Sequence, residues 1–99
     1  MVRHIILWKV KEEYAAEKDS IKAGVKEGLE GLKGQIEGLQ EIKVHTNGLA
    51  SSNADVMLES SFASEEALKA YAVHPKHVDV ANGKVRPFME IRLCIDFEE

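Results

Sequence analysis

The chain has 99 residues, of which 44% are hydrophobic and 30% are charged, and its formal net charge is −4. We expect one domain over residues 1–99, because this length leaves no room for a second core. The composition excludes a disordered or membrane-embedded chain. No basic cluster offsets the negative charge, so neither a nucleic acid nor a membrane is an expected partner. Cys94 is the only cysteine, which rules out an intrachain disulfide and predicts a reducing, cytoplasmic location.

The first half of the chain predicts a strand, a long helix and a second strand. Val2 to Val10 is apolar on both faces, which is typical of a strand in the middle of a sheet. Glu13 to Gln35 predicts a helix, and Leu39 to Thr46 predicts a strand that the turn at Asn47-Gly48 closes. The apolar stripe of the helix consists of Tyr14, Ile21, Val25, Leu29, Leu32 and Ile36.

Five glycines form a second stripe along the predicted helix: Gly24, Gly28, Gly31, Gly34 and Gly38. A glycine inside a helix costs about 1 kcal/mol relative to alanine, so the stripe calls for an explanation. Two explanations are open. Either a partner backbone approaches the helix closely there, or Gly34 and Gly38 simply end it.

The second half predicts strand, helix and strand. Ala54 to Phe62 is the third strand, and Ser64 caps a short helix that must end before Pro75. Lys76 to Lys84 adds a further helical turn or two, closed by Asn82-Gly83. The last strand alternates strictly between apolar and largely polar residues. Its apolar face is expected to belong to the core: Met89, Ile91, Leu93, Ile95 and Phe97.

The order strand, helix, strand, strand, helix, strand is that of an α+β, ferredoxin-like split βαβ fold. It predicts a four-stranded antiparallel sheet in which the last strand lies beside the first, then the third, then the second. Both helices would cover one face. The first strand is apolar on both faces, so the uncovered face is apolar too, and such a face implies a partner. Two sheets packed face to face about a two-fold axis would form a dimeric α/β barrel.

One local group of side chains could take part in a reaction. It consists of Tyr71, His74, Pro75 and His77. A phenol and an imidazole can act as a proton-transfer pair, but the same residues can equally pack the core and buttress the turn. A zinc site on His74 and His77 would need a third ligand such as His4 or Asp79. Cys94 is remote in sequence. No nucleotide-binding motif is present, so we expect neither a cofactor nor a metal.

The chain resembles the stress-responsive A/B barrel (Dabb) domain family over nearly its whole length. The resemblance rests on Met1 to Lys9, on Asp55, on Phe62 to Tyr71 running into His74-Pro75-x-His77, and on Arg86 to Phe97. It implies a homodimeric barrel. Some relatives are cofactor-free polyketide cyclases that close rings with a Tyr and His pair, which by position would be Tyr71 and His77, with His4 facing the cavity. Val56 stands where the cyclase pattern has a histidine.

Two functions therefore remain open. The first is a homodimer of unassigned reaction that binds a small apolar or aromatic molecule in the barrel cavity. The second is a cofactor-free enzyme, similar to a polyketide cyclase, in which Tyr71 and His77 are the catalytic acid and base. Under either reading the residues expected to line the cavity are His4, Ile6, Trp8, Val56, His74 and Phe88.

Overall fold

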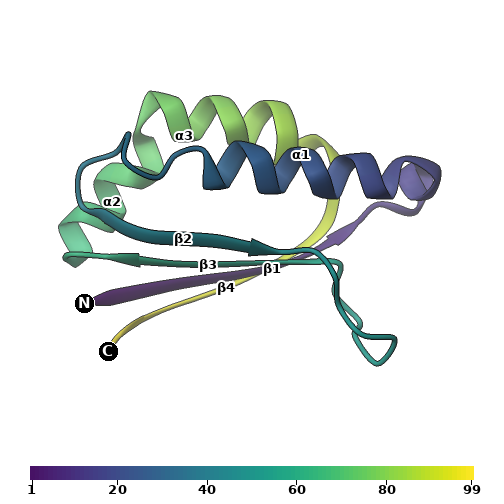
Figure 1. Cartoon of the computed structure of the whole chain (residues 1–99), viewed down its shortest axis with the longest axis horizontal. Coiled ribbons are helices and arrows are strands. Elements are labelled where there is room, and N and C mark those ends of the chain that lie inside the picture. Colours follow the sequence, from purple (N-terminus) through teal and green to yellow (C-terminus); the bar gives the residue numbers. More distant parts are fainter.

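The computed structural model describes all residues, 1–99, and shows a sheet with helices on one side (Figure 1). The strands and helices follow the predicted order. They are β1 (Val2–Val10), α1 (Lys18–Glu30), β2 (Leu39–His45), β3 (Val56–Phe62), α2 (Glu65–Val73), α3 (Pro75–Val80) and β4 (Met89–Glu98). Short 3₁₀ turns at Glu12–Glu17 and Arg86–Phe88 and a π-helical turn at Ala81–Val85 complete the chain. No helix is both long enough and apolar enough to cross a membrane.

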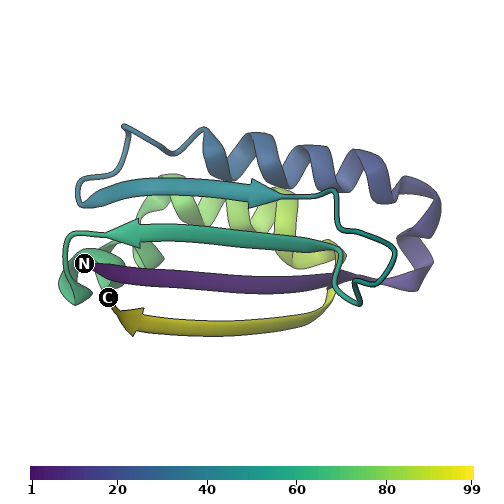
Figure 2. The ribbon, with the colours of Figure 1, turned by 60° about the horizontal axis from the view of Figure 1, so that its bottom comes forward.

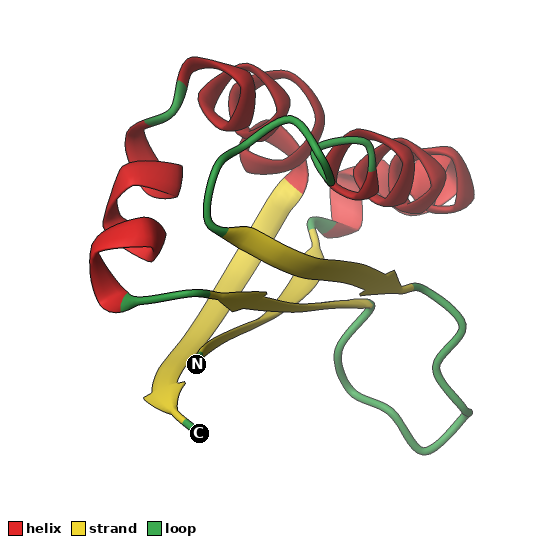
Figure 3. Ribbon diagram, turned by 60° about the vertical axis from the view of Figure 1, so that its left-hand side comes forward, coloured by secondary structure: helices red, strands yellow, loops and turns green.

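The four strands form one antiparallel sheet in the order β2-β3-β1-β4. Figure 2 shows this order, with β4 at one edge. The predicted sheet order and the predicted helical face are both confirmed. Figure 3 shows that the helices lie together on one side, while the loop between β2 and β3 projects beyond the sheet.

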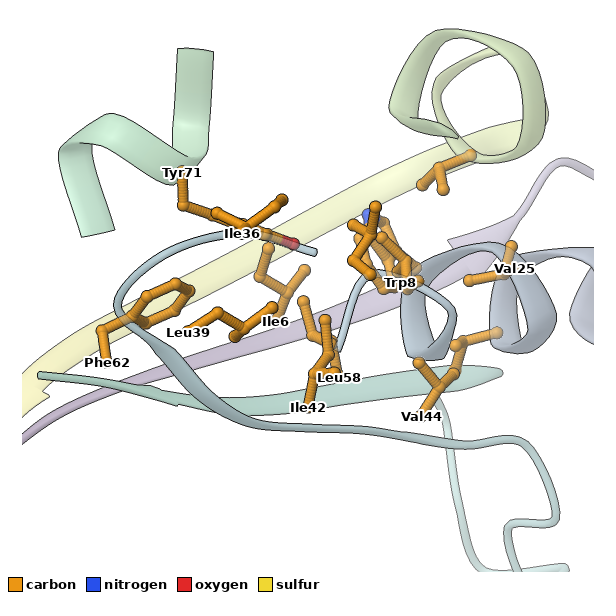
Figure 4. Packing of buried hydrophobic residues seen from close by; sticks show 14 of the residues in the cluster. Ile6, Trp8, Val25, Ile36, Leu39, Ile42, Val44, Leu58, Phe62 and Tyr71 are labelled. Carbon is orange, nitrogen blue, oxygen red and sulfur yellow. The ribbon is translucent and has the colours of Figure 1, made fainter. Parts of the chain in front are cut away.

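The core lies between the helices and the covered face of the sheet. Ile6, Trp8 and Leu58 point from the strands into this layer, and Val25 reaches it from α1 (Figure 4). The strand register places Ile6 opposite Leu58 and Trp8 opposite Val56, so one apolar face of each strand is buried together. Alternation then directs the side chains of Ile5 and Leu7 to the open face.

The expectation that β4 buries its apolar face in the core was wrong. Leu93 and Ile95 are 62% and 61% exposed, and Ile91 and Phe97 are exposed as well. The register pairs Ile95 with Ile5 and Leu93 with Leu7, which places these residues on the open face. Alternation shows that a strand has two faces, but it does not show which of them meets the helices.

The long helix is shorter than predicted, because α1 ends at Glu30 rather than near Gln35. The C-cap is Gly31, with a helical φ of −65°, and beyond it Gly34 and Gly38 adopt φ angles of 81° and 85°, which favour glycine. A Cβ on Gly28 would lie 2.8 Å from the Cγ1 atom of Val80. The close approach at Gly28 is therefore made by a side chain of the same protein, not by a partner backbone.

The start of α2 and the break before Pro75 form as predicted, but the helical segment after Pro75 does not end where it was predicted to end. Ser64 caps α2 by accepting a hydrogen bond from the Ala67 amide, and His74 leaves the helical region before Pro75. Asn82-Gly83 does not close the segment, however. The chain stays helical to Val85 because both Ala81 and Val85 are buried against the core.

Candidate functional site

A cavity of about 150 Å³ lies between the sheet and the helices α2 and α3. Its lining is largely apolar and consists of His4, Ile6, Trp8, Leu29, Leu58, Leu68, Tyr71, Ala72, His77, Ala81, Val85, Arg86 and Arg92. A second, more open groove of about 530 Å³ runs between α2 and β4. The groove shares His4, Leu68, Ala72 and Arg92 with the cavity. We call the two spaces the inner cavity and the outer groove.

Tyr71 is the most buried polar side chain of the inner cavity. It lies on α2, is 1% exposed, and packs its ring 4.9 Å from that of Phe62, centroid to centroid. Its hydroxyl has no hydrogen-bond partner in the protein. Burial raises the pKa of this hydroxyl well above its usual value, so Tyr71 stays protonated and can donate a hydrogen bond.

His77 lies on the next helix, α3, and the centroid of its ring is 4.2 Å from that of the Tyr71 ring. Its Nδ1 donates to the carbonyl oxygen of Ala72 at 3.2 Å, which leaves Nε2 with the free lone pair. Burial, together with the positive charges of Arg86 and Arg92, lowers the pKa of His77. A neutral imidazole with a defined tautomer therefore lies beside the phenol.

His4 belongs to a second polar group, at the boundary between the inner cavity and the outer groove. Its Nδ1 pairs with the carboxylate of Asp96 on the neighbouring strand. The Sγ atom of Cys94 lies 3.8 Å from the same nitrogen and 3.5 Å from Oδ1 of Asp96. Burial, and then the nearby Asp96 carboxylate, raise the pKa of the Cys94 thiol.

The structure brings only some of the predicted site residues together. His4, Ile6, Trp8, Tyr71 and His77 all line the inner cavity. The other three predicted residues do not line it: Val56 is buried in the core, Phe88 packs against Tyr14, and His74 caps α3 by accepting a hydrogen bond from the Lys76 amide at 3.1 Å. His74 and His77 belong to no group of three possible metal ligands.

Sequence reasoning missed Asp96 as a partner of His4 and set Cys94 aside as a ligand because it is remote in sequence. The alternation of β4 does put Cys94 and Asp96 on one face. Their proximity to His4 follows from the register between β1 and β4, which pairs His4 with Asp96. Two strands some 90 residues apart carry no local signal of that register.

The inner cavity combines a hydrogen-bond donor, a neutral base and apolar walls. A buried phenol can donate to a carbonyl or hydroxyl oxygen, and Nε2 of a neutral histidine can accept a proton from a nearby carbon or oxygen. Apolar walls suit an aliphatic or aromatic ring and keep water out. The arrangement therefore fits a small, mostly apolar molecule that carries an oxygen.

Comparison with known proteins places this geometry in context. The sequence matches the stress responsive A/B barrel domain over residues 2–99. A dimeric protein of unknown function and ferredoxin-like fold from Bacteroides fragilis is 30% identical, with a TM-score of 0.91 over 99% of this chain and 95% of that chain. A dimeric ferredoxin-like protein of unknown function from Thermobifida fusca is 21% identical, with a TM-score of 0.77 over 97% and 88% of the two chains.

An enzyme also shares the fold. Hydroxynitrile lyase from Passiflora edulis is 20% identical, with a TM-score of 0.71 over 97% of this chain and 90% of that chain. At this identity the likeness extends to the fold alone. No curated protein matches the sequence.

Proposed function

Because this chain belongs to the family of stress-responsive A/B barrel domains, we propose that it acts as a homodimer that binds a small apolar or aromatic molecule in each inner cavity. The bound molecule carries a carbonyl or hydroxyl oxygen that accepts a hydrogen bond from Tyr71. One observation carries the proposal, namely the Tyr71 hydroxyl, which is buried without a hydrogen-bond partner on a residue that lines the cavity.

A buried hydroxyl without a partner costs about 1–3 kcal/mol, because it has lost its bonds to water and gained none. A ligand oxygen would restore that bond, and the remaining walls would gain from contact with an apolar body. The hydroxyl therefore supplies both affinity and selectivity for a molecule with an oxygen at one end.

The size of the inner cavity suits a single six-membered ring. Cavities near 150 Å³ accommodate molecules of the size of benzene. The outer groove continues from the inner cavity and offers charged side chains of both signs, including Lys69, Arg92 and Glu65. A larger ligand would place its ring inside and a polar tail in the groove.

The open face of the sheet supports a homodimer. Leu7, Ile91, Leu93, Ile95 and Phe97 form an exposed apolar surface on β1 and β4, which we call the open apolar face. A contiguous apolar surface of this kind marks an interaction site, and solved structures with this fold are dimeric. Two copies packed through this face would enclose it in a barrel about a two-fold axis.

We place this dimer in the cytoplasm. Cys94 is the only cysteine of the chain and is exposed. An exposed free thiol persists in a reducing compartment and is oxidised outside one. Expression of a tagged chain followed by fractionation tests this location, and recovery outside the cytoplasm contradicts it.

Binding can be measured through Trp8, the only tryptophan, which lines the inner cavity. We expect cyclohexanone to change its fluorescence and to bind about 3–10-fold more tightly than methylenecyclohexane, which has nearly the same shape but lacks the oxygen. Tyr71→Phe should abolish this preference. Tyr14→Phe is the matched control, because Tyr14 packs on Phe88 outside the cavity. Equal affinity of the native protein for the two molecules contradicts the proposal.

A second function, proton transfer at a carbonyl compound, is favoured by the position of His77 beside Tyr71. With the ligand oxygen held by the phenol, Nε2 of His77 would take a proton from the adjacent carbon and return it. Nuclear magnetic resonance in D₂O would then show faster exchange of the α-hydrogens of cyclohexanone. We expect His77→Asn to remove this acceleration and His74→Asn to keep it. Unaccelerated exchange by the native protein leaves binding as the function and excludes this second one.

A further inference from the structure

Three side chains of different chemistry meet at the junction of β1 and β4. They are the imidazole of His4, the thiol of Cys94 and the carboxylate of Asp96, and one possible ligand atom from each lies within 4.8 Å of the others. The pairing of His4 with Asp96 and of Ile6 with Cys94 creates this group. Its members lie on the covered face of the sheet and line the outer groove.

The spacing of the three donors suits a tetrahedral metal ion. Zinc bound at about 2.0–2.3 Å separates its ligand atoms by about 3.3–3.8 Å along the edges of the tetrahedron. The Sγ atom of Cys94 lies 3.8 Å from Nδ1 of His4 and 3.5 Å from Oδ1 of Asp96. His4 and Asp96 are closer because they share a hydrogen bond, and a metal ion would take the place of that proton.

The donor set indicates which metal fits. A thiolate, an imidazole and a carboxylate together are typical ligands of Zn²⁺, whereas Mg²⁺ and Ca²⁺ prefer oxygen alone. Three protein ligands leave a fourth position for water or another ligand, and the outer groove of about 530 Å³ gives that position access to solvent.

The imidazole of His4 is held in place before any metal binds. It is 7% exposed and lies edge-on to the rings of Phe62 and Tyr71, at centroid distances of 6.2 and 6.3 Å. Cys94 and Asp96 stand on one regular strand, two residues apart. Such support limits the reorganisation that binding requires.

From this geometry we propose that His4, Cys94 and Asp96 form a zinc site with one open coordination position. The site is separate from the hydrogen bond that Tyr71 offers to a ligand, and it goes beyond the proposed binding of a small molecule. Binding forms Zn–N, Zn–S and Zn–O bonds; the thiol proton leaves to solvent, and the proton on Nδ1 of His4 is transferred through solvent to Nε2, which leaves the imidazole neutral.

Titration of the full chain with Co²⁺, after treatment with a chelator and a reductant without thiols, tests the site. We expect the thiolate-to-cobalt charge-transfer band and tetrahedral d–d bands to saturate at one ion per chain. Zinc should then displace cobalt and erase both signals. Absence of a saturable thiolate band in the native protein overturns the proposal.

Variants locate the ion. Cys94→Ser should lose the charge-transfer band, and Asp96→Asn should weaken zinc binding, measured by competition with a chromophoric chelator, by at least about 10-fold. Both residues are exposed, so circular dichroism should show an unchanged fold. His45→Asn is the matched control, because His45 also faces a carboxylate, that of Glu59 at 3.5 Å, but has no nearby thiol. Native zinc affinity in Cys94→Ser would falsify the site even if cobalt binds.

Discussion

Two polar side chains, the buried Tyr71 and the half-buried Asp55, show how the presence or absence of a partner decides the effect of burial. Asp55 accepts hydrogen bonds from the Val10 amide at 2.8 Å and from Nζ of Lys18 at 3.2 Å. Partial burial alone would raise the pKa of Asp55, but these bonds hold it below its usual value. Tyr71 has no such partner.

We expect Asp55→Asn to destabilise the protein by about 1–2 kcal/mol at pH 7, because it removes the charge that both donors face. The folded state lowers the pKa of this group, so its contribution is present above the unfolded pKa and is lost as the pH falls through the folded pKa. Chemical unfolding at pH 7 and at about pH 3 should therefore show a smaller difference between the two proteins at the lower pH. An equal loss at both pH values contradicts the charged role of Asp55.

Tyr71→Phe should have the opposite effect on the ligand-free protein. Removal of an unpaired buried hydroxyl leaves the packing intact and is expected to stabilise the fold by about 1 kcal/mol. Thermal unfolding of the two proteins without added ligand measures the difference. A loss of more than about 1 kcal/mol would mean that the hydroxyl has a structural partner, and the case for a ligand would weaken.

At the scale of elements, contact between α1 and the segment after α2 positions the inner cavity. Gly28 faces Val80 on α3, and Gly24 faces Lys84 in the π-helical turn. The two glycines lie one helical turn apart on the same helix and differ in the space around them. Substitution of each glycine by alanine therefore distinguishes the effect of helix propensity on stability from the effect of packing.

We expect Gly24→Ala to stabilise the protein by up to about 1 kcal/mol, because its Cβ would lie in ordinary contact, 3.7 Å from Cδ of Lys84. Gly28→Ala should instead cost about 1 kcal/mol net, since its Cβ would lie 2.8 Å from Cγ1 of Val80. Guanidinium unfolding followed by Trp8 fluorescence measures both. Equal stabilisation by the two substitutions contradicts the close packing of α1 on α3.

The order and type of the elements could be predicted from the sequence because each depends on local periodicity or on a local stop signal. The strand alternation of Val56 to Phe62, the cap at Ser64 and the break at Pro75 are of this kind. The burial of β4 could not be predicted, because it depends on which face meets the helices. The pairing of His4 with Asp96 depends on a register set across the whole chain.

The same distinction between local and long-range signals applies to the residues of the candidate site. The pairing of Tyr71 with His77 was implied by the family resemblance, and the structure places the two ring centroids 4.2 Å apart. Val56 and Phe88 were expected at the cavity but lie in the core and against Tyr14. Alternation separates the two faces of a strand, but only the packing of the helices shows which face is covered and where along it a cavity remains.

At the scale of the whole molecule, the proposed dimer covers the open apolar face with a second copy of the chain. We expect the native protein to sediment as a dimer and Leu93→Asp to weaken dimerisation by roughly 100-fold, because the interface would bury an unpaired charge. Leu49→Asp is the control, since Leu49 is 79% exposed and lies in the loop between β2 and β3, not on the open apolar face. A native monomer, or a dimer that Leu93→Asp leaves unchanged, contradicts packing through this face.

The central claim is that the Tyr71 hydroxyl donates a hydrogen bond to the oxygen of a small molecule bound in the inner cavity. A crystal structure of the protein soaked with cyclohexanone tests it most directly. We predict one ring in the cavity beside Trp8, with its carbonyl oxygen about 2.6–3.0 Å from the Tyr71 hydroxyl. A cavity without the ring, with the hydroxyl bonded to another group of the protein, would contradict the claim.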